Sequence, residues 1–359
     1  MQRTMHHREF PGTGVSVSEV GFGLWTLSTG WWGDKTDDEA VAMLREAYHT
    51  HGITFFDAAD AYGNGRSERQ LAAAFGTMRD RVVYGTKIGY DIYDEAAQAA
   101  RRGQSELPQR FEPAFMRRAV DECLRRLNTD YIDVLQLHNV KMAHVRDPLV
   151  WDTLRALTRE GKIRAWGAAF GPAIGWLYEA VELVEREPDI NTIQMIWNIL
   201  EQHPGTAMLD AARTHAPNCV FNIRVTHASG MLEGKYTEHT VFPENDHRRH
   251  RPRSWLVNGV RKVQTLDFLT SRGVTLGQAA LQWLLAEPRV VTTLPNIYDS
   301  EQLAEFAAAP QAPPLTREQM QRIAELAQRN FGVVEEPMAY KGTMHRDPGA
   351  ASQAARAAS

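Results

Sequence analysis

The feature that most constrains the fold is a repeated alternation between short apolar runs and longer amphipathic stretches of helical period. This alternation is typical of parallel strands joined by crossover helices, such as the helix expected over Pro113–Leu127. It defines eight candidate strands: Val20–Gly23, Thr54–Asp57, Val82–Thr86, Ile132–Gln136, Ala165–Ala169, Thr192–Ile196, Val220–Val225 and Val290–Leu294. Eight strand–helix units at this spacing predict an α/β fold, a closed (β/α)8 TIM barrel.

An open, doubly wound sheet is the structural alternative. No G-x-G-x-x-G pattern follows the first strand to receive a pyrophosphate, so the barrel is favoured. Before that strand, the segment Arg8–Val17 carries the turn residues Pro11, Gly12 and Gly14 between extended stretches. We expect an N-terminal β-hairpin here that closes the bottom of the barrel.

Three segments are too long to be simple connections: Trp25–Asp37, Gly89–Glu112 and Tyr236–Ser254. Each follows a strand, which places it on the C-terminal face, where barrels keep their active sites. We expect a single barrel domain over residues 1–335. Residues 336–359 are rich in Ala, Gly and Ser and lack a core-forming pattern, which predicts a flexible C-terminal tail.

The composition excludes several classes of partner. The 40 basic and 44 acidic residues give a net charge of -4, which argues against nucleic acid and anionic membranes and favours a small ligand. The N-terminus lacks the apolar stretch of a secretory signal, and no segment is long and apolar enough to cross a bilayer, so we expect a soluble, cytoplasmic protein. Cys123 and Cys219 are too few for a disulfide framework or a thiolate metal site and are expected in the core. The oligomeric state stays open.

Four polar side chains stand at or just beyond the ends of consecutive candidate strands. Asp57 ends the second strand and Tyr62 follows five residues later, while Lys87 and His138 end the next two strands. Each residue alone is more often a cap, a solvated charge or a structural histidine. In a closed barrel, however, all four meet at one mouth, and their chemistry is complementary.

A tyrosine gives up its proton reluctantly at neutral pH, but a nearby ammonium stabilises the phenolate. Lys87 can supply that ammonium, and Asp57 is the counter-ion that a buried lysine needs. His138 can then orient a substrate oxygen or share in the proton relay. The four residues predict a proton-transfer site in which Tyr62 is the general acid/base.

The chain closely resembles aldo-keto reductases, particularly bacterial members and the potassium-channel β-subunit branch. The resemblance runs from about Arg8 to Arg329 and rests on these motifs: Phe56-Asp57-Ala58-Ala59-Asp60-Ala61-Tyr62-Gly63, Gly65-Arg66-Ser67-Glu68, Leu137-His138, Arg159-Glu160-Gly161-Lys162-Ile163-Arg164 and Gly234-Lys235-Tyr236. It implies a Tyr-Lys-Asp-His tetrad at Tyr62, Lys87, Asp57 and His138, and NADP(H) extended across the mouth. It implies no metal. We expect the basic stretch His247-Arg248-Arg249-His250-Arg251 to be a solvated loop rather than a metal or phosphate site.

The resemblance also implies a set of cofactor-binding residues. Gln194 matches a contact to the nicotinamide carboxamide, Trp197 stands where an aromatic ring stacks on the nicotinamide, and Gln302 and Glu305 match adenine contacts. The remaining expected cofactor contacts are Gly23, Leu24, Trp25, Asp57, Gly230, Leu232, Pro295, Asn296 and Asp299.

The chain departs from the family at three places around this cofactor. Ala169-Phe170 replaces a Ser-Asn pair that holds the carboxamide, and Thr226-His227 replaces the Pro-Leu of the pyrophosphate loop. Tyr298-Asp299 stands where an arginine and a small polar residue clasp the adenosine 2′-phosphate. A carboxylate repels a phosphate dianion but can accept hydrogen bonds from a free ribose hydroxyl, so we expect a weakened NADPH preference, with NAD(H) as the alternative cofactor.

The substrate is expected to be a small carbonyl or alcohol compound held among aromatic side chains. The expected substrate-binding residues are Trp25, Trp31, Trp32, Tyr62, Tyr90, His138, Asn139 and Phe170. The leading hypothesis is an oxidoreductase that transfers a hydride between a nicotinamide cofactor and an aldehyde, ketone or sugar-like alcohol. Two alternatives are a binding or regulatory protein with little turnover and a catalyst that uses the tetrad for acid–base chemistry without net redox.

Overall fold

Eight parallel strands form one sheet in the order β10-β9-β8-β7-β6-β5-β4-β3, so neighbours in the sheet are neighbours in the chain. The computed structural model describes residues 5–100, 105–171, 176–270 and 273–335. The strands are β3 (Phe22–Gly23), β4 (Phe55–Asp57), β5 (Val83–Ile88), β6 (Ile132–His138), β7 (Ile163–Ala169), β8 (Thr192–Ile196), β9 (Val220–Arg224) and β10 (Val290–Leu294). All eight predicted strands are present, with ends that differ by a few residues.

The two edges of this sheet meet. Val20 forms a parallel bridge with Thr293, the amide of Gly21 donates to the Thr293 carbonyl at 2.9 Å, and the amide of Thr293 donates to the Glu19 carbonyl at 2.9 Å. The residues just before β3 therefore pair with β10, and the sheet closes. The prediction of a (β/α)8 barrel is confirmed.

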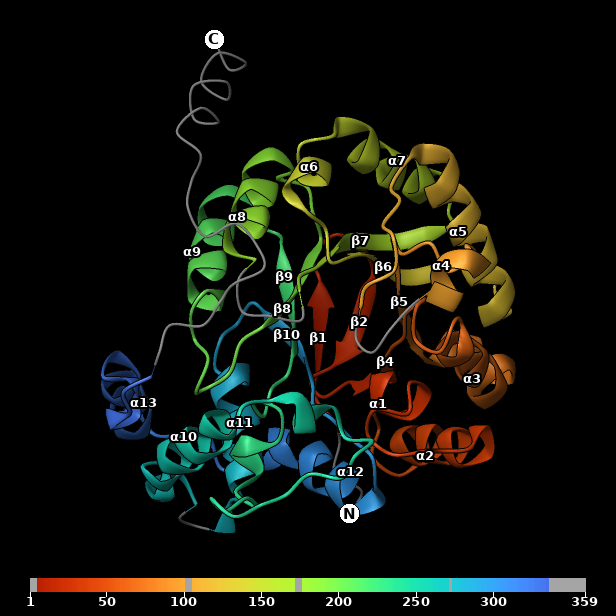
Figure 1. Cartoon of the computed structure of the whole chain (residues 1–359). Helices are drawn as coiled ribbons and strands as arrows, with labels where there is room; N and C mark the ends of the chain where they lie inside the picture. Colours follow the sequence, from red (N-terminus) through yellow and green to blue (C-terminus); the bar gives the residue numbers. More distant parts are fainter. Residues whose placement is uncertain (1–4, 101–104, 172–175, 271–272, 336–359) are drawn as a thin grey trace.

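The helices form a ring outside the strands, as Figure 1 shows for α2, α3, α5, α7, α8 and α9. The helices are α1 (Trp25–Ser28), α2 (Asp37–His49), α3 (Arg66–Phe75), α4 (Glu95–Ala100), α5 (Pro113–Leu127), α6 (Met142–Val145), α7 (Pro148–Arg159), α8 (Leu177–Arg186), α9 (Gly205–His215), α10 (Arg253–Gln264), α11 (Leu276–Leu285), α12 (Ser300–Ala307) and α13 (Arg317–Gln328). Several begin at a threonine whose hydroxyl accepts from an amide of the first turn, as Thr36 does for α2.

Alternate residues of each strand face the lumen and the helix ring. In β6, Leu135 and Leu137 belong to the core under the helices, whereas Val134 belongs to a separate apolar cluster inside the barrel. We call this set the lower lumen cluster; it consists of Phe10, Val15, Val17, Phe55, Val134, Ala165, Val220, Val291 and Leu294. The same alternation carries His138, four residues after Val134, to the mouth of the barrel.

The N-terminal hairpin closes the lower end of the lumen. β1 (His7–Phe10) and β2 (Val15–Ser18) pair antiparallel, which confirms the hairpin expected over Arg8–Val17. Phe10, Val15 and Val17 are buried in the lower lumen cluster. The hairpin is therefore a plug whose apolar face replaces solvent under the strands.

The long connections on the C-terminal face contain structure of their own. Trp25–Asp37 includes α1, and Gly89–Glu112 includes α4, so neither is a plain loop. Cys123 and Cys219 are both buried, as expected. Within the described residues, no helix combines the length and apolar character that a membrane span requires. The tail expected over 336–359 lies outside the described residues.

Truncating a buried side chain of the plug should lower the free energy of unfolding without disturbing the mouth. Phe10→Ala removes a ring that is 1% exposed, and we expect the free energy of unfolding to fall by about 3–5 kcal/mol. Urea denaturation measures this change. Val241→Ala, at a side chain that is 78% exposed, is the control and should change the value by less than about 0.5 kcal/mol. A loss for Phe10→Ala no larger than that of the control would mean that the hairpin does not seal the barrel.

Candidate active site

A buried ion pair lies at the mouth, where β4 and β5 end. The Lys87 ammonium donates to Asp57 Oδ2 at 2.6 Å and to the Ala58 carbonyl at 2.8 Å. The Lys87 side chain is fully buried and that of Asp57 is 5% exposed. Gln136 of β6 donates to the second Asp57 oxygen at 3.4 Å. The ammonium is thus held charged by a carboxylate, which is the condition for a lysine away from water.

Tyr62 lies directly beside this ion pair. It stands in the turn between β4 and α3, and the Lys87 nitrogen is 4.9 Å from the centroid of its ring. The Tyr62 and His138 rings meet edge to face, with centroids 5.8 Å apart. The amide of Asp60 donates to the Lys87 carbonyl at 3.0 Å, which ties the turn to the end of β5. The structure therefore brings together all four residues of the expected tetrad.

His138 is poised as a neutral imidazole. Burial lowers its pKa well below the ordinary 6.5, and the positive charges of Lys87 and Arg224 lower it further. Its Nδ1 has no hydrogen-bond partner among the residues that the structure describes. A neutral imidazole can donate one N–H bond to a substrate oxygen without adding a charge to the mouth.

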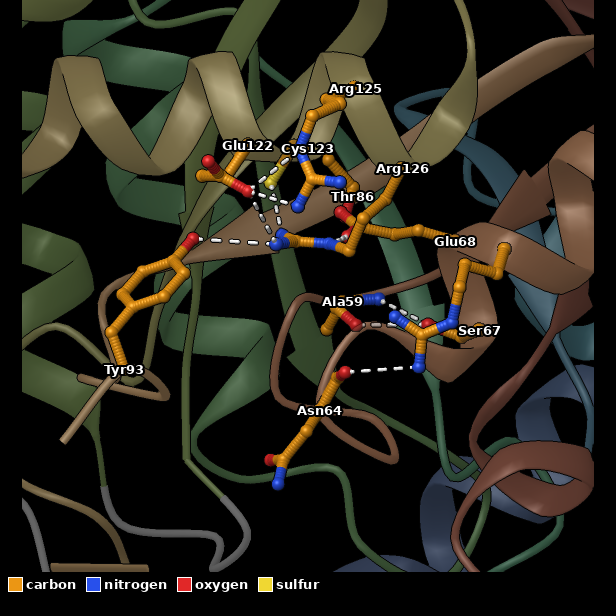
Figure 2. Close-up of polar contacts among 11 residues, drawn as sticks. Ala59, Asn64, Ser67, Glu68, Thr86, Tyr93, Glu122, Cys123, Arg125 and Arg126 are labelled. Carbon is orange, nitrogen blue, oxygen red and sulfur yellow. Dashed lines mark hydrogen bonds and ion pairs between the residues drawn. The ribbon is translucent and has the colours of Figure 1, made fainter. Parts of the chain in front are cut away.

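A second buried ion pair, between Glu68 and Arg126, lies next to the turn that joins β4 to α3; Figure 2 shows its polar contacts. Glu68, in the first turn of α3, accepts from the Thr86 hydroxyl at 2.7 Å and from Arg126 of α5. The side chains of Glu68 and Arg126 are 0% and 6% exposed. Gly65, at φ +79°, leaves room for this arginine, because a Cβ there would lie 2.4 Å from Arg126 Cδ. Glu68 stands in one of the motifs of the resemblance without an assigned role, and the sequence did not predict the part played by Arg126.

Asp60 is a third carboxylate under the same turn, also missed from sequence. It is fully buried, and neither carboxylate oxygen has a hydrogen-bond partner of good geometry among the described residues. Burial, followed by the nearby Glu68 carboxylate, raises the pKa of Asp60 well above its ordinary value, and Arg126 and Lys87 only partly offset this. The raised pKa favours the neutral acid at Asp60, so Asp57 is the carboxylate that pairs with the Lys87 ammonium.

Tyr90 and Asn139 form one wall of the mouth next to His138. The Asn139 amide donates to the Tyr90 hydroxyl at 2.6 Å, and the Tyr90 and His138 rings are 5.0 Å apart. Two other expected contacts are buried among apolar side chains. Phe170 is buried in the core under the helices, and the Trp197 ring packs on Trp283 of α11 with centroids 4.4 Å apart.

A strap over residues 236–254 lies against the tryptophans that follow β3. Trp32 and Asp246 form an antiparallel bridge, and the Trp32 ring stacks on Tyr298 at 5.9 Å. Trp25 and Trp31 meet the ring of His247 and the ring of His250, at 5.4 and 6.2 Å.

The expectation of a solvated loop at 247–251 is wrong for Arg248. Its side chain is 8% exposed, pairs with Asp246 at 2.5 Å and covers the Trp32 ring at 4.3 Å. Because a buried guanidinium needs a carboxylate and gains from aromatic faces, this arginine fastens the strap to the mouth.

Unpartnered polar atoms line the lumen on the side of β8 and β9. Gln194 Nε2 and both carboxamide atoms of Asn222 are buried without a hydrogen-bond partner among the described residues. Ile193 and Met195 lie in the core under the helices, so alternation turns Gln194 toward the lumen. Buried amides in this state fit a polar ligand that enters the mouth.

The expected adenine-side contacts lie beyond β9 and β10, and several of them form hydrogen bonds with other groups of the protein. Asp299 caps α12 by accepting from the amide of Gln302 at 2.7 Å. The Gln302 side chain donates to Glu233 at 2.9 Å, and Glu305 accepts from Thr275 at 2.6 Å. The other expected cofactor residues lie at the strand ends and in the following loops: Gly23, Leu24, Gly230, Leu232, Pro295 and Asn296.

The family model described as Aldo/keto reductase family matches residues 19–328, most of the chain. The chain belongs to this family. Membership implies an NAD(P)H-dependent oxidoreductase. In the described part of the chain, no group of three or more His, Cys, Asp or Glu side chains could hold a metal ion.

Relatives of this aldo-keto reductase family member cover most of its length. Aldo-keto reductase YhdN of Bacillus subtilis is 28% identical over 299 residues, covering 79% of this chain and 82% of the relative. The NADH-specific methylglyoxal reductase of Escherichia coli is 26% identical and covers 83% and 91%. The solved holo form of aldo-keto reductase AKR11C1 from Bacillus halodurans is 25% identical, covers 90% and 96%, and superposes with a TM-score of 0.69.

Removing the arginine behind the Tyr62 turn should destabilise the protein strongly. Arg126→Met leaves Glu68 charged, buried and next to Asp60, so we expect the free energy of unfolding to fall by about 3–5 kcal/mol. The double variant Glu68→Gln Arg126→Met removes both charges and should recover part of that loss. Arg125→Met, at the adjacent and 70% exposed arginine, is the matched control. Equal losses for Arg125→Met and Arg126→Met would contradict the role given to the pair.

His227, which is buried after β9, should make the protein acid-sensitive. Burial lowers its pKa from 6.5 to about 4, although its Nε2 lies 3.0 Å from the Gly277 carbonyl. The unfolded chain therefore binds a proton more readily, and stability falls as pH drops from about 6.5 to about 4. At pH 5 the loss is about 2 kcal/mol.

The measurement is chemical denaturation of wild type and His227→Leu at pH 7 and pH 5. We expect the variant to lose less stability over this interval, by about 2 kcal/mol. His215→Leu, at a side chain that is 43% exposed, is the control and should keep the wild-type pH dependence. If His227→Leu keeps the wild-type pH dependence, the buried His227 ring does not cause the loss of stability between pH 7 and pH 5.

Proposed function

We propose that this chain interconverts an aldehyde or ketone and the corresponding alcohol, with Tyr62 as the general acid in reduction and the general base in oxidation. One observation carries the proposal: the Lys87 ammonium, held by Asp57, lies 4.9 Å from the centroid of the Tyr62 ring, and the His138 ring meets that ring edge to face. The reaction class follows from the family, and the arrangement of the three side chains around Tyr62 supports the Tyr62 hydroxyl as the proton donor.

The residues at the mouth fit a nicotinamide cofactor. Unpartnered amide groups of Gln194 and Asn222 face the lumen, and a carboxamide is the ligand group that such donors and acceptors can satisfy. Loops after β9 and β10 would hold the rest of the molecule, through Gly230, Pro295 and Asn296. When bound, a nicotinamide cofactor supplies or accepts the hydride.

The chain's own groups orient the substrate and move the proton. A carbonyl oxygen between the Tyr62 hydroxyl and the His138 ring receives a hydrogen bond from each. As negative charge develops on that oxygen, the Tyr62 hydroxyl transfers its proton, and the Lys87 ammonium stabilises the phenolate left behind. Asp57 keeps the ammonium charged and fixed, so little reorganisation is needed during the reaction. In the oxidative direction the same phenolate takes the proton back.

The cofactor proposal includes both NADPH and NADH. The family implies NADP(H), whereas the Asp299 carboxylate at the start of α12 disfavours a phosphate dianion nearby. A relative of this chain is named as an NADH-specific methylglyoxal reductase, which agrees with use of NADH within the family. We expect the preference for NADPH over NADH to be weak.

Two other functions remain as outcomes of the test. A binding or regulatory protein would have little reason to keep a buried Lys–Asp pair, which is rarely a net stabiliser. Acid–base chemistry without net redox would use the same four side chains and would leave the nicotinamide absorbance unchanged.

Tyr62→Phe should abolish most turnover while leaving the cofactor site intact. We expect kcat to fall by about 10²–10⁴-fold, because the phenol supplies the proton, and the cofactor dissociation constant to change little. Nicotinamide absorbance with a panel of aldehydes, ketones and polyols, in the presence of NADPH or NADH, measures the rate. Tryptophan fluorescence measures cofactor binding.

Tyr131→Phe is the matched control, since that tyrosine precedes β6 at the opposite end of the barrel, and it should keep wild-type activity. Cofactor binding with no turnover on any substrate would support the binding protein. Product without a change in nicotinamide absorbance would support acid–base chemistry. An active Tyr62→Phe variant would remove Tyr62 from the mechanism.

A further inference from the structure

Arg224 is the last residue of β9 and faces the lumen. Phe221 and Ile223 belong to the core under the helices, whereas Val220 belongs to the lower lumen cluster. Asn222 is buried and lies on the same face of β9 as Val220. Continuing the alternation by two residues places the Arg224 side chain at the mouth, on the same face of the strand as Asn222. It is half-buried there.

This guanidinium has neither a counter-ion nor a hydrogen-bond acceptor among the described residues, whereas half-buried Arg289 donates to the Ala216 and Cys219 carbonyls. Arg79, Arg126 and Arg248 each pair with a carboxylate, at 2.7 Å or less. For Arg224, no described residue places a carboxylate within 4.0 Å or accepts a hydrogen bond from the guanidinium. A partly desolvated charge of this kind is costly, and a ligand anion is the group that relieves it.

The charge of Arg224 acts on the substrate side of the mouth. Burial lowers the pKa of His138, and the charges of Lys87 and Arg224 lower it further, while burial raises the pKa of Tyr90 and Arg224 partly offsets that rise. This agrees with a guanidinium at the end of β9 that is near the wall formed by these two rings. Lys87 is the other cation there, and Asp57 neutralises it at 2.6 Å. Glu106, which is exposed, acts on Tyr90 from the loop after β5 but makes no ion pair with Arg224. Of the two cations that act on His138, Arg224 is therefore the one without a carboxylate partner among the described residues.

We propose that Arg224 binds a carboxylate of the substrate, so that the preferred substrates are aldehydes or ketones that carry an acid group. The planar guanidinium matches a carboxylate in a two-pronged hydrogen bond, which fixes both position and orientation. The inference rests on the proposed function. The reaction is unchanged: hydride adds to the carbonyl carbon, Tyr62 protonates its oxygen, and the carboxylate is neither formed nor consumed.

The test compares two aldehydes on the same ring, the anionic 4-carboxybenzaldehyde and its neutral methyl ester, methyl 4-formylbenzoate, which is larger by one methyl group. Full-length wild type should reduce the acid with a kcat/KM at least about tenfold above that for the ester. Arg224→Met should lower this acid-to-ester ratio at least about tenfold, mainly through KM for the acid, and Arg224→Lys should keep part of the preference because it keeps the charge. Arg81→Met, at an exposed arginine just before β5, is the control and should keep the wild-type ratio.

A second readout separates this inference from the proposed function. Calorimetry of 4-carboxybenzaldehyde with Tyr62→Phe measures binding without turnover, and adding Arg224→Met should weaken that binding at least about tenfold. If wild type reduces neither aldehyde but this binding difference holds, the redox proposal fails and the carboxylate site stands. A ratio that Arg224→Met leaves unchanged, or a loss confined to NADPH and NADH binding, would overturn the carboxylate site.

Discussion

The structure depends on one buried ion pair, Lys87 with Asp57, which lies where two strands of a closed barrel end. An ammonium away from water is stable only beside a carboxylate, so the pair forms only if the register between β4 and β5 is fixed. Asp57 pairs with Gly85 across these two strands. Lys87 comes two residues after Gly85, so it lies on the same face of β5 and closer to the mouth. The plugged, closed barrel below keeps these strand ends fixed, and the pair in turn fixes the charge beside Tyr62.

The Tyr62 turn is supported by charges that the reaction does not use. Glu68 and Arg126 neutralise each other next to the turn, while the burial of Asp60 and the nearby Glu68 carboxylate raise the pKa of Asp60 well above its ordinary value. The turn thus presents one carboxylate to Lys87 rather than three. Arg248 has a comparable task across the mouth, where it fastens the strap over 236–254 to Trp32. Buried charges position the catalytic groups at both sides of the site.

The sequence predicted the barrel and the meeting of Tyr62, Lys87, Asp57 and His138, because strand alternation and strand ends are local features with a fixed spatial meaning. It missed Arg126, because a charged residue on an amphipathic helix reads as solvent-facing, and only the packing of α3 against α5 buries it. It likewise read Arg248 as solvated, because part of its aromatic cover comes from Trp32, more than two hundred positions away in the chain, and the local sequence does not show that Tyr236 and Phe242 fold over the guanidinium.

Residues just beyond strand ends were the least predictable. Phe170 and Trp197 follow β7 and β8, where the alternation that assigns a side chain to the lumen or to the helices loses its meaning. Both were expected near the ligands, and both pack under the helices. Arg224 is the converse case, since it still lies within β9 and its direction follows from the strand.

The most direct test of the account is the single-turnover rate of hydride transfer in wild type, Lys87→Met and the double variant Asp57→Asn Lys87→Met. The double variant removes both buried charges, so that folding is not confounded by an unpaired carboxylate. The account predicts that both variants bind the nicotinamide cofactor nearly as wild type does and transfer hydride at least about 10²-fold more slowly. Wild-type rates in a folded, cofactor-binding double variant would contradict it.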